Sequence, residues 1–254
     1  MVIVKNEKIH NIPTLHVVQK ANKDCPLPTV IYSHGFTSAK EHNLPFAYLM
    51  AEKGYRVLLP DSILHGERAD GKTEDEIQFE FWKIVAQNLK ELDVLKQFIE
   101  EKNLLLNGRI GLAGTSMGGI STSAALTQYS WIKVAAVLMG SPKAMEMAEY
   151  TIQQVRQSGV KLPFTEDELK QQVQELEAID LSKHVHKLAQ RPVLFWHGDQ
   201  DRVVPFQQSF SFYESTIETY QNREDFRYIR EKGKDHKVTR NAILETVNWF
   251  SKYL

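Results

Sequence analysis

The sequence contains little of what several classes of protein require. Its 254 residues include a single cysteine, Cys25, which has no partner within the chain for a disulfide, so an oxidising compartment is not implied. The longest apolar run, residues 134–139, is far shorter than the ~20 residues that span a bilayer. The first ten residues, MVIVKNEKIH, lack the apolar core of a signal peptide. We therefore expect a cytoplasmic protein without a membrane span.

An excess of charge of one sign is also missing. Lys and Arg total 31, Asp and Glu total 32, and the formal net charge is -1 at pH 7. Without surplus basic residues to neutralise phosphates, the composition argues against a nucleic-acid partner. A chain of this length and ordinary composition buries a large core without disulfides or metals. We expect one soluble domain over residues 1–254, and the sequence does not indicate an oligomeric state.

Short apolar runs alternate with longer helical patterns along the chain. Apolar residues repeat about every 3.6 positions over residues 74–102 and 238–254, which predicts amphipathic helices, and a shorter helical pattern covers 120–129. The apolar runs have the continuous apolarity of parallel strands that are covered on both faces. This alternation predicts the α/β class, with a mostly parallel sheet between helices. The strand candidates are residues 29–33, 56–60, 109–113, 134–139 and 192–196, with weaker ones at 1–4, 14–19 and 226–230.

Residues 142–190 interrupt the alternation, because they carry helical patterns and no strand signal. Thr165 and Glu168 have the spacing of a capping box, and Phe164 with Leu169 has that of a hydrophobic staple. A segment of about 45 residues is too long for a plain crossover loop. We expect a helical insertion that acts as a lid, and the alternative is extra packing on an edge of the sheet.

The pattern Gly114-x-Ser116-x-Gly118 carries the clearest chemical meaning. It follows a predicted strand and precedes a predicted helix, which is the setting of a nucleophile elbow. A serine on so sharp a turn has a strained backbone, and side chains two residues away on either side would collide, which explains the glycines. The turn exposes the hydroxyl and leaves the backbone N–H of Met117 free to donate. The alternative is an ordinary Gly/Ser turn.

A nucleophilic serine needs a base, and the base needs an acid that orients it. His236 lies between the last predicted strand and the last predicted helix, and Asp199 and Asp201 follow the strand before it. Serine, acid and histidine thus occur in the chain order of an elbow enzyme. The position after the strand does not separate the two aspartates, although a turn at Gly198 gives a weak preference for Asp201.

Histidine–glycine pairs follow three of the predicted strands. In the first, His34-Gly35-Phe36, the backbone N–H of Phe36 is expected to face that of Met117 and complete an oxyanion hole, unless the segment is a plain turn. His34, His65 and His197 together could suggest a metal site, but no carboxylate-rich cluster accompanies them. We expect histidines that pack loops, and neither a metal nor a cofactor.

These motifs resemble the α/β-hydrolase superfamily over nearly the whole chain. The resemblance implies that fold and assigns the acid to Asp201, through the pattern Gly198-x-x-Asp201-x-x-Val204-Pro205. The strings HGFTSAKEHN (34–43), HGER (65–68) and GTSMGGI (114–120) resemble the branch of dienelactone hydrolases and prolyl oligopeptidases, and within it small bacillus-type bacterial proteins classed as esterases. The chain departs from the branch in two ways. It has no propeller, so peptidase activity is not implied, and its nucleophile is not a cysteine.

The sequence therefore predicts a serine hydrolase, a carboxylesterase that cleaves small or medium acyl esters through an acyl-enzyme. Ser116 is the expected nucleophile, His236 the base and Asp201 the acid, with Phe36 and Met117 as oxyanion donors. A thioesterase or an acyl-aminoacyl hydrolase would use the same residues, and so would a haloperoxidase-like or C–C bond hydrolase. From a different class, a non-catalytic scaffold that binds a ligand is disfavoured because every catalytic part is present.

Overall fold

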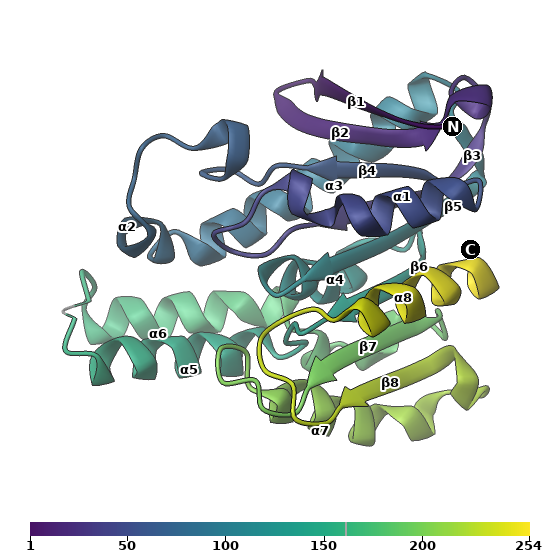
Figure 1. Cartoon of the computed structure of the whole chain (residues 1–254). Coiled ribbons are helices and arrows are strands. Elements are labelled where there is room, and N and C mark those ends of the chain that lie inside the picture. The colour runs from purple at the N-terminus through teal and green to yellow at the C-terminus, as the bar shows by residue number, and fades with distance from the viewer. Residues whose placement is uncertain (161) are drawn as a thin grey trace.

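A single sheet of eight strands forms the centre of the protein (Figure 1). The computed structural model describes residues 1–160 and 162–254. The strand order is β1-β2-β4-β3-β5-β6-β7-β8, in which β1, β2 and β4 pair antiparallel and all later neighbours pair parallel. The eight predicted strands and the mostly parallel sheet are thus confirmed. Their bounds are β1 Val2–Ile9, β2 Ile12–Gln19, β3 Leu27–Ser33, β4 Arg56–Pro60, β5 Leu105–Thr115, β6 Ile132–Leu138, β7 Val193–Gly198 and β8 Phe226–Glu231.

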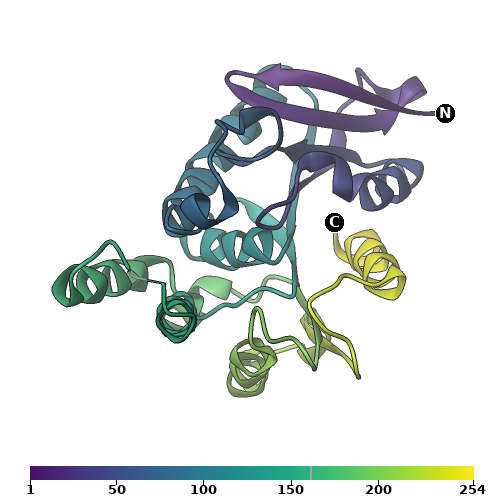
Figure 2. The ribbon, with the colours of Figure 1, turned by 60° about the vertical axis from the view of Figure 1, so that its left-hand side comes forward.

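Helices cover both faces of the sheet, as Figure 2 shows. On one face, α1 (Leu44–Glu52) and α8 (Arg240–Tyr253) bury residues such as Phe46 and Phe250 against the strands. On the other face, α3 (Phe81–Glu101), α4 (Met117–Gln128) and α7 (Phe206–Thr216) do the same with residues such as Leu92 and Phe212. Two apolar cores therefore hold the sheet rigid, and the loops at the carboxyl ends of its strands are fixed in position.

The prediction of one helix over residues 74–102 is wrong, because the helix is interrupted between Gln78 and Phe81. The structure has a short α2 (Glu74–Gln78), which begins with a capping box at Thr73, and then α3. The break lets two neighbouring rings face different partners. Phe79 packs against Phe164, with 6.5 Å between ring centroids, whereas Phe81 packs against Phe36 at 5.7 Å. The apolar residues repeat with a helical period through this region, but the aromatic contacts of Phe79 and Phe81 with distant residues accompany an interruption of the helix.

The segment between β6 and β7 is helical in its described residues. It contains α5 (Ala144–Gln157), α6 (Glu166–Glu175) and the short 3-10 turns η4 (Leu176–Ile179), η5 (Leu181–Lys183) and η6 (Val185–Leu188). The Thr165–Glu168 capping box begins α6. The two helices project from the body as an arm, seen at the left of Figures 1 and 2. At its base the arm packs on Trp82 of α3, through an apolar cluster that includes Ala148, Val173 and Leu176.

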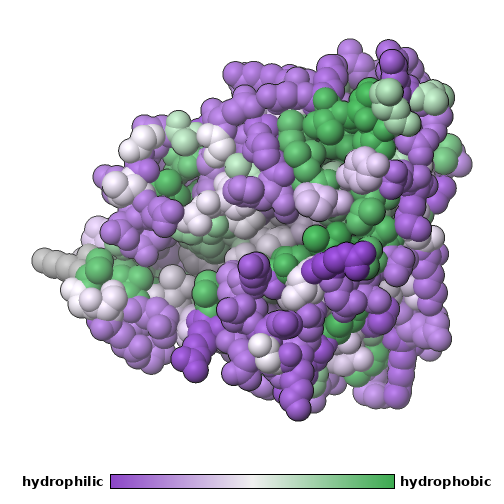
Figure 3. All heavy atoms as spheres, in the orientation of Figure 1, coloured by the Kyte–Doolittle hydropathy of each residue, from purple (hydrophilic) through white to green (hydrophobic). Residues whose placement is uncertain are grey.

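Within the part of the chain that the structure describes, none of the helices combines the length and the apolar character needed to cross a bilayer. Figure 3 shows one face of the molecule, on which hydrophilic residues predominate and apolar ones form separate patches.

Candidate active site

Ser116 occupies a strained turn between β5 and α4. Its φ is 56° and its ψ is -116°, a backbone conformation that residues with a side chain rarely adopt. A Cβ placed on Gly114 would lie 2.1 Å from the carbonyl oxygen of Gly118, and one placed on Gly118 would lie 2.0 Å from that of Ser33. Both positions therefore require glycine. This is the steric reason that the sequence suggested for the pattern.

The side chains of Ser116, His236 and Asp201 come from three separate loops and form one hydrogen-bonded series. His236, in the loop between β8 and α8, lies with Nε2 2.8 Å from Ser116 Oγ and with Nδ1 2.6 Å from Asp201 Oδ2. Because a carboxylate can only accept hydrogen bonds, Nδ1 carries the proton, and Nε2 is left to accept from the serine hydroxyl. Gly198 makes this approach feasible, since a Cβ there would lie 2.4 Å from the carbonyl oxygen of Lys234.

The Asp201 carboxylate is buried and fully used as an acceptor. Its Oδ1 accepts from the backbone N–H groups of Val203 and Val204, at 2.9 and 3.0 Å. Its Oδ2 accepts from His236 and, at 3.1 Å, from Nε2 of His197. Burial raises the pKa of Asp201, but the hydrogen bonds from His197 and His236 outweigh it and hold this pKa well below its ordinary value. The carboxylate is thus held in its charged form.

Asp199 makes a different set of contacts. Its Oδ1 accepts from the backbone N–H of Gly233 at 2.7 Å, and its Oδ2 accepts from the Arg230 guanidinium at 2.9 Å. These bonds, that from Gly233 first, lower the pKa of Asp199. Both partners belong to β8 or the loop after it. Asp199 therefore fastens this loop, and the carboxylate in contact with His236 is that of Asp201.

Of the two expected oxyanion donors, Met117 follows Ser116 directly in the chain, and Phe36 lines the same pocket as Ser116. Among residues 1–160 and 162–254, no hydrogen bond uses the backbone N–H of Phe36 or of Met117 as donor. The loop of Phe36 lies against the serine, since a Cβ on Gly35 would be 3.5 Å from that of Ser116. Gly35 is not the strained residue of this turn. The positive φ of this turn, 58°, belongs to Thr37, and the turn is closed by the backbone N–H of Ser38, which donates to the carbonyl oxygen of Gly35 at 3.2 Å.

Two of the three loop histidines hold the loop that carries Phe36. His65 Nε2 accepts from the backbone N–H of Thr37 at 3.1 Å, and His34 Nε2 accepts from that of Ser62 at 3.0 Å. Nδ1 of His34 donates to the carbonyl oxygen of Gly35, and Nδ1 of His65 donates to that of Ile63. Such a ring must be neutral, because the accepting nitrogen carries no proton. Burial accordingly lowers the pKa of His34 to about 4 and also lowers that of His65.

The neutral state of His34 predicts a loss of stability in mild acid. In the unfolded chain its pKa is about 6.5, so the stabilisation is complete above that pH and is lost as the pH falls toward about 4. We expect the free energy of unfolding at about pH 5 to be roughly 2 kcal/mol below its value at pH 7. Urea titrations at the two pH values measure this difference.

The matched control for this titration is His34→Gln. Its side-chain oxygen replaces Nε2 as acceptor but does not titrate, so the pH slope of the variant should be flatter even if its overall stability falls. An unchanged slope would assign the acid sensitivity to other groups.

A pocket of about 450 Å³ opens beside Ser116. Apolar side chains from β3, α1 and α8 form much of its wall, and polar ones lie among them. Neither α5 nor α6 contributes a residue to the described wall. The lining includes Tyr32, Phe36, Ser38, His42, Phe46, Met139, His236, Lys237, Val238 and Ile243.

A buried charge cluster beside the site was not predicted from the sequence. The ammonium of Lys40, whose side chain is 0% exposed, lies 2.6 Å from Asp61 Oδ2 and 2.8 Å from Glu67 Oε1. Gly66 has a φ of 53°, and a Cβ there would lie 2.2 Å from Asp61 Oδ1. The strings 34–43 and 65–68 thus contribute to one ion-pair network that joins the loops after β3 and β4. The signal available in the sequence was a lysine and two carboxylates in loops of adjacent strands.

Known proteins resemble this chain both in sequence and in fold. A family model described as the prolyl oligopeptidase family matches residues 46–254. The chain is 45% identical over 255 residues to the Bacillus subtilis (strain 168) protein named "Putative esterase YitV", and 30% identical over 257 residues to "Esterase YjfP" of Escherichia coli (strain K12), with 100% of each chain covered. The structure of TT1662 from Thermus thermophilus is similar in fold, with a TM-score of 0.76 at 20% identity over 99% of this chain and 98% of that one.

Proposed function

The chain belongs to the prolyl oligopeptidase family, and from this premise we propose that it is a carboxylesterase that works through an acyl-enzyme on Ser116. Two relatives that match over their full length are named esterases, one of them as putative, and they support hydrolysis of an ester. The observation that carries the proposal is the pair of contacts of His236, 2.8 Å to Ser116 Oγ and 2.6 Å to Asp201 Oδ2.

The geometry supports the following sequence of steps. Ser116 Oγ attacks the ester carbonyl carbon while its proton passes to Nε2 of His236, and the backbone N–H groups of Phe36 and Met117 donate to the oxyanion. The tetrahedral intermediate collapses, and His236 returns the proton to the departing alcohol. Water then attacks the acyl-enzyme, with His236 as base, and releases the acid. Asp201 stabilises the positive charge that His236 carries twice in this cycle.

The substrate of this proposal is a small molecule with a small or medium acyl group. The pocket beside Ser116 falls within the roughly 300–1,000 Å³ of typical small-molecule sites, toward the lower end. The same side chains would also serve a thioester or an acyl-aminoacyl bond. A panel with one acyl group presented as ester, thioester and aminoacyl anilide tests the choice. The ester should give the highest kcat/KM, and a clear preference for either other bond would replace carboxylesterase by that activity.

We propose that the insertion over residues 142–190 acts as a lid that influences substrate choice. It does so from the side of Met117, away from the pocket described above. Tyr150 of α5 donates to the carbonyl oxygen of Arg202, next to Asp201, at 2.7 Å. Met147 of the same helix belongs to the apolar cluster that contains Met117 and Phe36. The helix thus borders the oxyanion region, although it does not line the pocket described above.

Shortening Met147 is the matching test. Met147→Ala should leave room beside Met117 and raise the ratio of kcat/KM for a long acyl ester to that for acetate by about tenfold, the scale of a few methylene groups in an apolar site. Kinetics over a series of acyl chain lengths measure this ratio. Val173→Ala, which shortens the same insertion where it packs on Trp82, is the control and should leave the ratio unchanged. An equal loss on all chain lengths in Met147→Ala would mean structural packing only.

A further inference from the structure

We propose that His197 is a positioning residue for the hydrolysis proposed above, and that it holds the Asp201 carboxylate in the orientation in which it receives the hydrogen bond of His236. The inference rests on the proposed function, but its geometry is independent of any substrate. The sequence placed His197 among the loop-packing histidines, and its contacts give it a further role.

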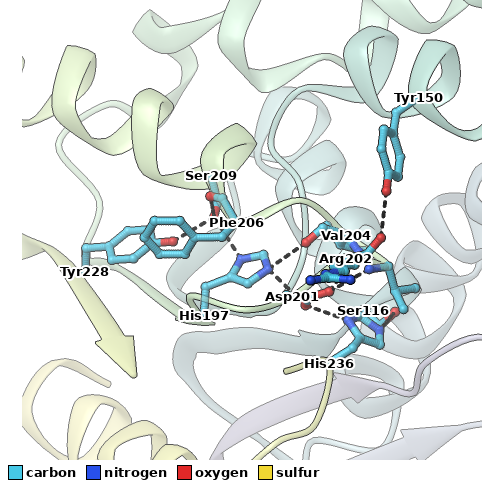
Figure 4. A network of polar contacts seen from close by, with 11 residues as sticks. Ser116, Tyr150, His197, Asp201, Arg202, Val204, Phe206, Ser209, Tyr228 and His236 are labelled. Atoms are coloured by element: carbon cyan, nitrogen blue, oxygen red, sulfur yellow. Dashed lines mark hydrogen bonds and ion pairs between the residues drawn. The ribbon is translucent and has the colours of Figure 1, made fainter. Parts of the chain in front are cut away.

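His197 is the next-to-last residue of β7 and is 1% exposed. Its Nε2 lies 3.1 Å from Asp201 Oδ2 and 3.0 Å from the carbonyl oxygen of Val204. Neither of these groups can donate, so Nε2 carries a proton whether the ring is neutral or charged. In Figure 4 the ring lies between the loop that carries Asp201 and Val204 on one side and the side chains of Ser209 and Tyr228 on the other.

A chain of hydroxyl groups fixes the other side of the ring. Nδ1 of His197 lies 2.8 Å from Ser209 Oγ, which lies 2.8 Å from the hydroxyl of Tyr228 and 3.2 Å from the carbonyl oxygen of Phe206. With a neutral ring, Tyr228 donates to Ser209, and Ser209 donates to Nδ1. With a charged ring, Nδ1 donates to Ser209, whose proton turns to Phe206. Both arrangements hold the ring in one place.

The contact matters because it completes the set of donors around the carboxylate. Two backbone N–H groups hold Oδ1, and His197 and His236 share Oδ2. Without the His197 donor, Oδ2 would be held only by the residue that it has to orient. The carboxylate could then rotate between catalytic steps, and its less neutralised charge would attract the protonated ring of His236 more strongly.

Few charged or titratable groups act on the His197 ring. Asp201 and, through it, His236 lie on one side, and Tyr228 of β8 lies on the other beyond Ser209. From α7, the ring of Phe206 faces His197 at 5.9 Å between centroids, and the Arg230 guanidinium lies over that same Phe206 ring. Burial raises the pKa of Tyr228, which therefore keeps its proton and remains able to donate.

Two amide variants separate positioning from packing. In His197→Gln the side-chain nitrogen can occupy the place of Nε2 and still donate to Asp201. In His197→Asn it can occupy only the place of Nδ1, so the Ser209 side is kept and the Asp201 donor is lost. We expect Asn to lower kcat about 10- to 100-fold, the loss for one hydrogen bond to a charged group, with KM within about twofold, and Gln to lower kcat less than about threefold.

The pH profile and proton NMR give readouts that packing alone would not move. In His197→Asn, but not in His197→Gln, the acid limb of kcat/KM should move to higher pH by about half a unit or more, because the Asp201 carboxylate has lost one donor. The resonance of the His236 Nδ1 proton, assigned by its loss in His236→Ala, should shift in the same variant. Circular dichroism checks that both variants fold.

The outcomes separate this inference from the proposed function. Equal losses in Asn and Gln with an unmoved acid limb would reduce His197 to a packing residue, and full activity in Asn would overturn its role altogether. If the wild-type protein hydrolyses no ester, the proposed function fails. The resonance of the His236 Nδ1 proton then remains as the test of whether His197 positions Asp201. A His236 resonance that is unchanged in His197→Asn would then overturn the positioning as well.

Discussion

Ser116→Ala is expected to remove ester hydrolysis, with kcat lower by at least about 10⁴-fold, because no other group can form the acyl-enzyme. What remains would come from the oxyanion donors and from binding alone. The turn geometry at Ser116 is imposed by Gly114, Gly118 and the strands around them, so the variant should fold. Initial rates on a short, soluble ester, together with circular dichroism, measure this result.

A matched control for this variant lies on the helix that Ser116 precedes. Ser123 is 1% exposed in α4, and its hydroxyl has no hydrogen-bond partner among the described residues. Ser123→Ala also removes a serine hydroxyl, within the helix that follows Ser116, and should leave kcat within about twofold, because a hydroxyl without a partner stabilises little. Retention of a large share of the activity by Ser116→Ala would contradict the mechanism, as would an equal loss in both variants.

Asp201→Asn is expected to lower kcat by at least about a hundredfold, and toward the roughly 10⁴-fold seen for the equivalent change in serine proteases. The Asp201 carboxylate accepts four hydrogen bonds and donates none. An amide can offer an oxygen on one side only, so its NH2 group would face either the backbone or the two histidines. Facing His236, it would favour the tautomer that has its proton on Nε2, and that tautomer cannot take the proton of Ser116.

Asp199→Asn provides the comparison, since it makes the same chemical change two residues away. Asp199 contacts Gly233 and Arg230 and not His236, so its loss should cost less than about tenfold in kcat. Kinetics of both variants, with circular dichroism as the folding control, decide between them. If Asp199→Asn were the variant with the large loss, the acid would be misassigned, although the serine mechanism would stand.

Much of the fold and the order of the site residues could be predicted from the sequence, because both depend on local signals. Most of the strands are short and apolar, and Gly114 of the elbow is needed for a local reason, because a Cβ there would meet Gly118, four residues later. Ser116 and His236 could be placed in loops after strands from these signals. What the sequence did not resolve depends on residues that are far apart in the chain.

The two aspartates illustrate this limit. Position alone did not separate Asp199 from Asp201, because the partners of Asp199 come from β8 and the loop that follows it. The same holds for His197, whose spacing of four residues from Asp201 gives no contact until the turn at Gly198 is known. The break at Phe79 and the Lys40–Asp61 pair likewise follow from tertiary contacts.

The central claim is that Ser116 is a nucleophile activated by His236, and a fluorophosphonate probe tests it most directly. The probe forms a covalent bond to an activated serine oxygen and needs no knowledge of the natural substrate. Mass spectrometry of the digested protein should place a single adduct on the peptide that contains Ser116, with no adduct in Ser116→Ala and much slower labelling in His236→Ala. An adduct elsewhere in the chain, or an unlabelled Ser116 in the folded wild-type protein, would contradict the account.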